Sequence, residues 1–472
     1  MRRVTPLHIE TKVAQSGRDA PLRNVNRRVA FTCDSKIRAF CQHVFLGTLI
    51  CLPAYSSERF AAPAMPSYER DHVHIDYSAS ARRNAVAQSN VVNETATNLS
   101  VHPTRGYLDE VLKDFEIDPA SQVLVFSKTS LQAAHISSQQ PRAIYFNDST
   151  YVAWVQGSDH MEVLTIDDDR GPVFFNVYNA PPKSLQFKRE SMMCLACHDS
   201  ASLQPGGVPL VLVRSSRVEG EMSPAGRVAP VQVTHATALE DRWGGWYVTG
   251  TLGVQLHLGN MPLAGPPDPT VRHINNRINL DSLASYIDTR PYFSDKSDVI
   301  ALLVLEHQAH VQNLITRVKY AVAKRKDLRE SNLSWAELTA DQQQALLTDL
   351  TGLATAVTFE DERRLLGRIR SNSSFRSRFE ARGPVDSHGR SLREFDLNTR
   401  MFRYPISYLV YSSAFQTLPR YAREYVYRHA MTLAESNSGH AELKQSRSAA
   451  VELLKGTLDD FAMVSTKRTR VQ

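Results

Sequence analysis

The sequence has few cysteines and only a small excess of charge of one sign. It has five cysteines in 472 residues, and its 55 Lys and Arg side chains against 49 Asp and Glu side chains leave a net charge of +6. So small an excess over this length does not predict nucleic-acid binding, and no basic–aromatic recognition motif is present. The 42% hydrophobic and 22% charged residues are typical of an ordinary globular protein. A chain of this length can bury a large core.

No stable membrane span is predicted, because a helix that crosses a bilayer needs about 20 apolar residues. The apolar run at residues 44–54 (VFLGTLICLPA) has the length of a signal-peptide core and follows Lys36 and Arg38. We expect residues 1–54 to be a leader with a signal-peptide-like segment, and the mature protein to be periplasmic or otherwise exported from a bacterium. An uncleaved anchor or a disordered tail is the alternative. Translation from near Val29 would explain the unusually long polar stretch before the apolar run.

The positions of the cysteines agree with export. Cys33, Cys41 and Cys51 lie in the predicted leader, so its cleavage leaves only Cys194 and Cys197. A mature protein without a spare thiol suits an oxidising compartment.

The remaining pair belongs to the motif Cys194-Leu195-Ala196-Cys197-His198. Cys-x-x-Cys-His is the attachment site of a c-type haem. On one helical turn the two sulfurs share a face, so each can form a thioether with one vinyl group of the porphyrin. The adjacent imidazole can bind the iron as the proximal ligand. The sequence therefore predicts one covalently bound haem c (iron) per chain, held by Cys194, Cys197 and His198.

Two other functions of a Cys-x-x-Cys pair fit less well. A redox dithiol usually follows a strand of a thioredoxin-like unit, and residues 186–193 (QFKRESMM) do not predict an apolar strand. A structural zinc site needs two further ligands at short spacing, and the chain has no second Cys or His pair of that kind.

The second axial ligand of the iron decides the chemistry of a haem site. His307 lies in the middle of an apolar stripe of a helix predicted at residues 298–324. A buried histidine needs a partner, so we take His307 as the leading distal candidate. A core histidine bonded to a carbonyl group is the alternative. Met261, His257 and His235 are further candidates.

The pattern of elements predicts an α+β fold. A β-rich N-terminal half, built of hairpins or a meander, would carry the haem motif, and an α-helical C-terminal half would pack over it. The expected divisions are a leader (1–54), a partly disordered linker (55–103), a β-rich haem c-binding region (104–280), a helical region (281–435), and a C-terminal helix with a basic tail (436–472).

Short apolar runs between turn-forming residues predict strands at 122–126, 143–146, 151–156, 161–166, 173–178 and 210–214, with a hairpin at 242–258. Helical periodicity predicts helices at 104–115, 298–324, 335–353, 360–369, 404–415, 421–433 and 449–461.

Two groups of side chains could serve either the core or a haem. Trp243, Trp246 and Tyr247 carry large apolar surfaces, which would fill the core or pack on a porphyrin face. The Arg-rich segment at residues 363–382 is expected to be a solvated face. One or two of its guanidinium groups could instead pair with haem propionates.

Four blocks of the chain resemble a group of uncharacterised bacterial proteins with a cytochrome c domain. They are CLACHDSASLQPGGVPLVLVRS, EDRWGGWYVTGTLGVQLHLGN, VIALLVLEHQAHVQNLIT and GRSLREFDLNTRMFRYPISYLVYSSAF, and the likeness covers roughly residues 105–430. The resemblance implies haem c binding, export and electron transfer, and it implies no particular substrate. The chain has His257-Leu258-Gly259-Asn260 where the resemblance suggests His-Met-Gly-Asn, so position 258 offers no thioether ligand.

Two functional classes follow from these patterns. The first is an exported electron-transfer protein with one haem, whose partner is a redox protein or a small-molecule electron donor or acceptor. The second is a haem enzyme, peroxidase-like or a small-molecule oxidoreductase, with an open distal site. The length of the chain favours the enzyme, whereas its single haem motif differs from the two of bacterial di-haem peroxidases. A haem sensor or a structural subunit is a third class.

Overall fold

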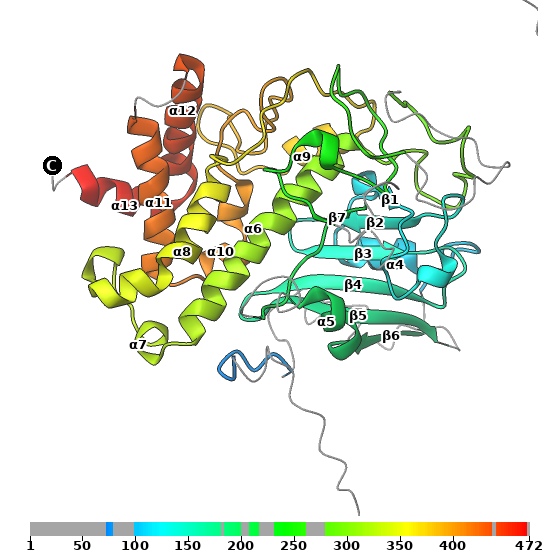
Figure 1. Ribbon diagram of the computed structural model, residues 1–472, viewed down its shortest axis with the longest axis horizontal. Coiled ribbons are helices and arrows are strands. Elements are labelled where there is room, and N and C mark those ends of the chain that lie inside the picture. Colours follow the sequence, from blue (N-terminus) through cyan, green and yellow to red (C-terminus); the bar gives the residue numbers. More distant parts are fainter. Residues whose placement is uncertain are drawn as a thin grey trace, which may run out of the picture. The chain divides into compact units, whose positions relative to one another are not determined.

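The computed structural model describes residues 72–78, 99–180, 184–199, 207–216, 231–260, 279–436 and 440–469. The predicted leader, most of the predicted linker and Met261 lie outside these residues. All of the described residues belong to one compact unit, Pro63–Gln472. The fold is α+β, as predicted, with an antiparallel sheet in the first half and helices in the C-terminal half (Figure 1).

The sheet is an antiparallel meander in which each strand pairs with the next one in the sequence. Its strands are β1 (Val123–Val125), β2 (Arg142–Phe146), β3 (Thr150–Trp154), β4 (His160–Asp167), β5 (Gly171–Ala180) and β6 (Ser184–Arg189). In the turn between β2 and β3, the Asn147 side chain accepts hydrogen bonds from the amides of Ser149 and Thr150, at 3.1 and 2.9 Å. Because Asn, Asp and Ser favour turns of this kind, their positions between apolar runs predicted the meander from the sequence.

Strand β6 was not predicted, and it ends three residues before the helix that carries the Cys-x-x-Cys-His motif. It pairs with β5 in the register Val177↔Phe187. Leu185 and Phe187 alternate along the strand and are only partly buried. Two apolar residues give only a weak alternation of apolar and polar positions, and the residues around them are polar. The sequence pattern therefore did not predict this strand.

The strand predicted at 210–214 is mostly absent. Only Arg214–Ser215 forms a strand, β7, which pairs with β8 (Val231–Gln232). The backbone of Val211 is instead bonded by the Asn313 side-chain amide, which accepts from its N–H at 2.7 Å and donates to its carbonyl at 2.9 Å. The Asn313 side chain therefore satisfies the two backbone groups of Val211 that a neighbouring strand would bond in a sheet.

The hairpin predicted at 242–258 is also wrong. This segment forms single β-bridges to residues remote in sequence, pairing Trp246 with Val125, Thr249 with Asp298, Gly250 with Leu280, and Thr251 with Arg370. Gly250 has φ +123°, and a Cβ there would lie 2.6 Å from Val299 Cγ1, so the close approach requires glycine.

Helix α6 (Val299–Ala323) is the central helix of the second half, as predicted. Its N-cap Asp298 accepts hydrogen bonds from the amides of Ile300 and Ala301 at 2.7 and 2.9 Å. Buried residues occur on all sides of α6, as expected of a helix enclosed by protein. It contacts β5 and helix α8 (Ala340–Val357).

The other α-helices of the described residues are α4 (Leu108–Asp114), α5 (Met192–His198), α7 (Lys326–Arg329), α9 (Phe375–Glu380), α10 (Ser413–Gln416), α11 (Arg420–Glu435), α12 (Ala441–Thr457) and α13 (Asp459–Thr469). The predicted helix at 404–415 is a 3₁₀ turn followed by α10, and that at 449–461 divides between α12 and α13. No helix forms at 281–298 or 360–369. In the latter segment, the amides of Leu365 and Ile369 donate to carbonyls of Thr399 and Leu397 instead of closing helical turns.

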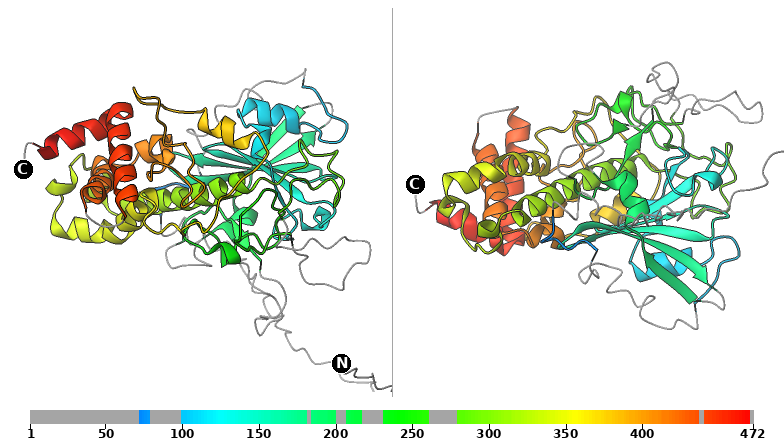
Figure 2. Two further views of the ribbon diagram at one scale, coloured as in Figure 1. Left: turned by 90° about the horizontal axis from the view of Figure 1, so that it is seen from above. Right: turned by 60° about the horizontal axis from the view of Figure 1, so that its bottom comes forward.

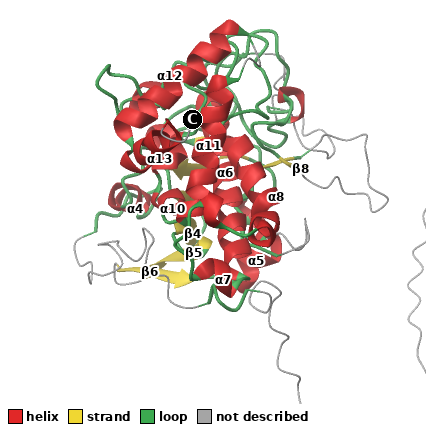
Figure 3. Cartoon of the chain, turned by 90° about the vertical axis from the view of Figure 1, so that its left-hand side faces the viewer, coloured by secondary structure: helices red, strands yellow, loops and turns green. Residues whose placement is uncertain are grey.

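Alternate residues of the sheet face two different hydrophobic cores. Val125 and Tyr151 belong to the core that contains α6, α8 and α11, whereas Leu124 and Val152 belong to the core beneath α4. Helix α6 therefore packs against one face of the sheet, and α8 and α11–α13 lie on the side of α6 away from the strands, as Figure 2 shows. Figure 3 views the molecule from the side of these helices, with the strands behind them. Within the part of the chain that is described, no helix is both long and apolar enough to cross a membrane.

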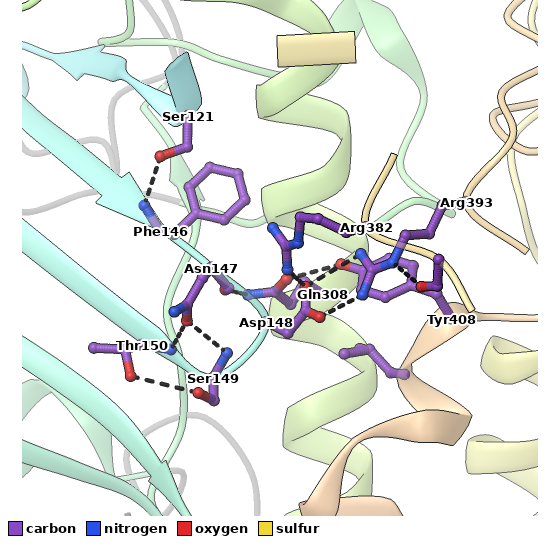
Figure 4. Close-up of polar contacts among 12 residues, drawn as sticks. Ser121, Phe146, Asn147, Asp148, Ser149, Thr150, Gln308, Arg382, Arg393 and Tyr408 are labelled. Carbon is purple, nitrogen blue, oxygen red and sulfur yellow. Dashed lines mark hydrogen bonds and ion pairs between the residues drawn. The ribbon is translucent and has the colours of Figure 1, made fainter. Parts of the chain in front are cut away.

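Polar contacts join the β2–β3 turn to the helical half (Figure 4). The Asp148 carboxylate accepts hydrogen bonds from Arg382 and Arg393. Gln308 of α6 donates to the Asn147 carbonyl at 2.7 Å and accepts from the Tyr408 hydroxyl at 2.8 Å. These bonds fix the turn at the end of strands β2 and β3 against α6.

Candidate functional site

The Cys-x-x-Cys-His motif forms helix α5. Leu195, in the middle of the motif, is 3% exposed and anchors the helix in the core beneath α4. Cys194 is half-buried and Cys197 is exposed, and they form no disulfide. The local sequence thus turns one apolar side chain into the protein and leaves one cysteine half-buried and the other exposed on a short helix.

His198 is held in one tautomer by a backbone carbonyl. Its Nδ1 lies 2.9 Å from the carbonyl oxygen of Leu210. A carbonyl oxygen only accepts, so Nδ1 carries the proton and Nε2 keeps its lone pair. The ring packs against Phe174, with 4.7 Å between centroids. Burial lowers the pKa of His198 to about 4, so the ring is neutral at physiological pH, as a metal ligand must be.

The environment of Cys194 differs from that of a reactive dithiol. Burial, followed by the charges of Glu162 and Glu190, raises the pKa of the Cys194 thiol to about 12. Catalytic Cys-x-x-Cys pairs have depressed thiol pKa values, because the thiolate is the nucleophile. This thiol is therefore protonated at neutral pH and is not activated for disulfide exchange.

A cavity of about 390 Å³ adjoins the motif, and Cys194, Cys197 and His198 are part of its lining. Strands β2 to β5 form another wall, through the face that also carries Tyr151. Leu305 of α6 closes a further side. The volume is within the range of about 300–1,000 Å³ that is typical of ligand pockets.

The charged residues in the described lining are three cations, Lys128, Arg142 and Arg214, and one anion, Glu162, so the formal net charge is +2 (3 − 1). Arg142 Nη1 donates to Glu162 Oε2 at 2.7 Å, and Ser130 Oγ donates to Glu162 Oε1 at 2.9 Å. The Nε of Arg142 is buried and has no hydrogen-bond partner among the described residues. The cavity therefore offers an excess of positive charge to an anionic group.

The basic side chains at the cavity are not those that the sequence suggested. From the Arg-rich segment, Arg376, Arg378 and Arg382 pair with Glu380, Asp118 and Asp148, and none of these three is in the lining. Arg142 and Arg214 take that place. The signal that could have found Arg142 is that it is the one charged residue of an otherwise apolar strand, β2; in the structure it bonds Glu162, two strands away.

The predicted distal ligand, His307, does not line the cavity that contains the Cys-x-x-Cys-His motif. Its Nδ1 is 2.9 Å from Nδ1 of His235, and its Nε2 is 2.8 Å from Ser407 Oγ. Its ring stacks on Phe359 at 4.3 Å. Leu305 lines the cavity, and two helical residues turn the side chain by about 200°. His307 therefore faces away from the motif, and we do not retain it as the distal ligand.

The other candidates are also accounted for. His257 is buried against Trp243, its Nδ1 accepts from the Gly259 amide at 3.0 Å, and it does not line the cavity. His235 belongs to the cluster around His307. In the described part of the lining, His198 is the only histidine and Met193 the only methionine.

Trp243, Trp246 and Tyr247, which the sequence offered for the core or for a porphyrin face, lie in different places. Trp246 lines the cavity and donates from Nε1 to the carbonyl of Arg214 at 2.8 Å. Trp243 is fully buried, and Tyr247 belongs to the core beneath α4. Of the three, Trp246 has the position to pack against a bound group.

Comparison with protein-family models, with curated proteins and with solved structures yields no match.

Proposed function

We propose that the protein is an exported c-type haem protein that transfers electrons through one covalently bound haem. The observation that carries the proposal is the placement of Cys194, Cys197 and His198 on the wall of one cavity, with Nε2 of the histidine left as its basic nitrogen. Export rests on the leader of the sequence and on the haem c motif itself.

The residues present fit a haem. Cys194 and Cys197 would form the two thioethers, for which an unactivated protonated thiol is no obstacle, and His198 Nε2 would be the proximal ligand. Trp246 and Phe174 would pack on the porphyrin. Two haem propionates would balance the net charge of the lining. A bound haem supplies one-electron chemistry at its iron, and the chain supplies attachment, orientation and charge.

Arg142 is one of the three cations of the described lining, with Lys128 and Arg214, that would pair with a propionate. Its Nη1 is bonded to Glu162. A guanidinium group can bond a carboxylate through two parallel N–H donors.

An exposed apolar rim supports docking of a redox partner. Leu131 and Met193 line the cavity and are 48% and 57% exposed, and the adjacent Met192 is 70% exposed. Exposed apolar patches often mark interaction sites. This rim would meet a redox protein or a small-molecule electron donor or acceptor.

A second candidate is a haem oxidoreductase with an open distal position. It is favoured by the described lining, which offers no second histidine and only Met193, next to Cys194 in the sequence. An open position lets small ligands or peroxide reach the iron, whereas a closed one favours electron transfer.

The visible spectrum of the purified haem-loaded protein, with and without carbon monoxide, separates the two. Electron transfer predicts a low-spin ferric spectrum and a ferrous form that does not bind carbon monoxide. A high-spin ferric spectrum with rapid carbon monoxide binding would overturn electron transfer in favour of the enzyme.

A further inference from the structure

A second group of metal-ligating side chains lies apart from the cavity. His235 Nε2 is 2.8 Å from Asp361 Oδ1, and His310 Nε2 is 3.8 Å from Asp361 Oδ2. The three donor atoms of this group all lie within 4.8 Å of one another. We propose that His235, His310 and Asp361 bind a divalent transition-metal ion of the Zn²⁺ type.

The donor set suits such an ion. Two imidazoles and one carboxylate are ligands of catalytic zinc and of non-haem iron, and three protein ligands leave a position open to water or a substrate. Ligands about 2.1 Å from a tetrahedral ion are about 3.4 Å apart. His235 and Asp361 are closer than this and His310 is farther away, so a small outward movement of Asp361 and inward movement of His310 complete the site.

The site is rigid on one side and accessible on the other. The side chain of His235 is 3% exposed, whereas those of His310 and Asp361 are 21% and 31% exposed. Phe359 packs against the His235 ring at 5.3 Å. One ligand is therefore fixed in the core, and the other two have the freedom to close on an ion that enters from solvent.

His307 is the outer partner of the buried ligand. When His235 Nε2 binds a metal, its Nδ1 must carry the proton, which it can donate to His307 Nδ1 at 2.9 Å. His307 then donates from Nε2 to Ser407 Oγ at 2.8 Å. Hydrogen bonds of this kind orient metal-bound histidines and raise their affinity. This accounts for a fully buried histidine in the apolar stripe of α6.

Charges near the group are already paired. Arg242 donates to the His235 carbonyl at 2.8 Å, and its guanidinium also bonds Glu306 at 2.8 Å, with both side chains buried. The Asp361 carboxylate faces both His235 and His310 and is available as a ligand.

Zn²⁺ alone is the probe that tests the site. The full chain, matured with haem, is treated with a chelator, equilibrated with Zn²⁺, desalted and analysed for zinc by mass spectrometry. We expect one zinc ion per chain. His310→Gln and Asp361→Asn should each weaken binding by about 100-fold or more, and His307→Gln by about 10- to 100-fold.

Two controls make the result specific. His429→Gln alters a partly exposed histidine paired with Glu360, next to Asp361 in the sequence, and should leave zinc binding unchanged. Cys194→Ala/Cys197→Ala should retain the zinc, which separates this site from the motif and from the proposed haem function. Absence of stoichiometric zinc, or equal binding by wild type and His310→Gln, would overturn the proposal. His310 is partly exposed, so its variant keeps the test valid where Asp361→Asn fails to fold.

Discussion

The Nδ1 atom of His198 lies 2.9 Å from the carbonyl oxygen of Leu210. This single bond selects the tautomer whose Nε2 can bind a metal, and it joins the motif helix to the segment that forms the next wall of the cavity. The proposed haem site therefore depends on a bond between two residues that are twelve positions apart in the sequence.

If His198 is the proximal ligand, His198→Gly should lower the yield of haem-loaded protein. The haem that is still attached should lack a protein imidazole as its ligand. Added imidazole should restore a low-spin spectrum, because it can bind in the space left by the side chain. Visible spectra with and without imidazole measure this. His388→Gln, at a histidine that is 74% exposed, is the control. A structural role alone would give no response to imidazole.

Arg142 and Glu162 should shift the reduction potential of a bound haem in opposite directions. Arg142→Gln removes a positive charge from the lining and should lower the reduction potential, because a positive charge near the iron favours the ferrous state. Glu162→Gln removes a negative charge and should raise the potential. Redox titration of the two variants tests the signs. Arg376→Gln, whose partner is Glu380, should leave the potential unchanged. Shifts of the same sign would contradict this account.

Leu195→Ala should destabilise the fold by about 2–5 kcal/mol, because a buried leucine is replaced by a cavity. Chemical denaturation monitored by circular dichroism gives the free energy of unfolding. Ala196→Ser alters the neighbouring exposed position of α5 and should change stability by less than about 0.5 kcal/mol. Equal effects of the two substitutions would show that Leu195 does not anchor the helix.

Stability should fall in acid through His257. Burial lowers the pKa of this histidine to about 4, whereas an unfolded histidine has a pKa of about 6.5. As the pH falls from about 6.5 towards 4, the unfolded state binds a proton that the folded state does not, which costs about 1.4 kcal/mol per pH unit.

His257→Gln should flatten that pH dependence, because glutamine does not titrate and its amide oxygen can still accept from the Gly259 amide. Urea unfolding of both proteins at pH 7, 6 and 5 measures the difference. Parallel slopes for the variant and the wild type would contradict the assignment.

Strands β2 to β5 and helix α6 were predicted from the sequence, because turn-forming residues and helical periodicity are local patterns. Contacts between distant segments were not predicted. The segment 242–258 bonds to four separate parts of the chain, a pattern that no local periodicity encodes.

The placement of His307 shows a second limit. Periodicity established that the middle of α6 is buried, but α6 is buried on all sides. Leu305 faces the cavity and His307 faces His235, and a stripe of buried residues does not say which neighbour each one meets. Arg142 and Glu162 were missed for a related reason, because their pairing follows from the register of β2, β3 and β4.

The measurement that tests the central proposal most directly is the intact mass of the exported protein after acid–acetone extraction, made in cells with a working haem c maturation system. The wild-type chain is predicted to retain the mass of one haem, and Cys194→Ala/Cys197→Ala to retain none. A wild-type polypeptide without haem, in cells that mature a control cytochrome c, would contradict the account.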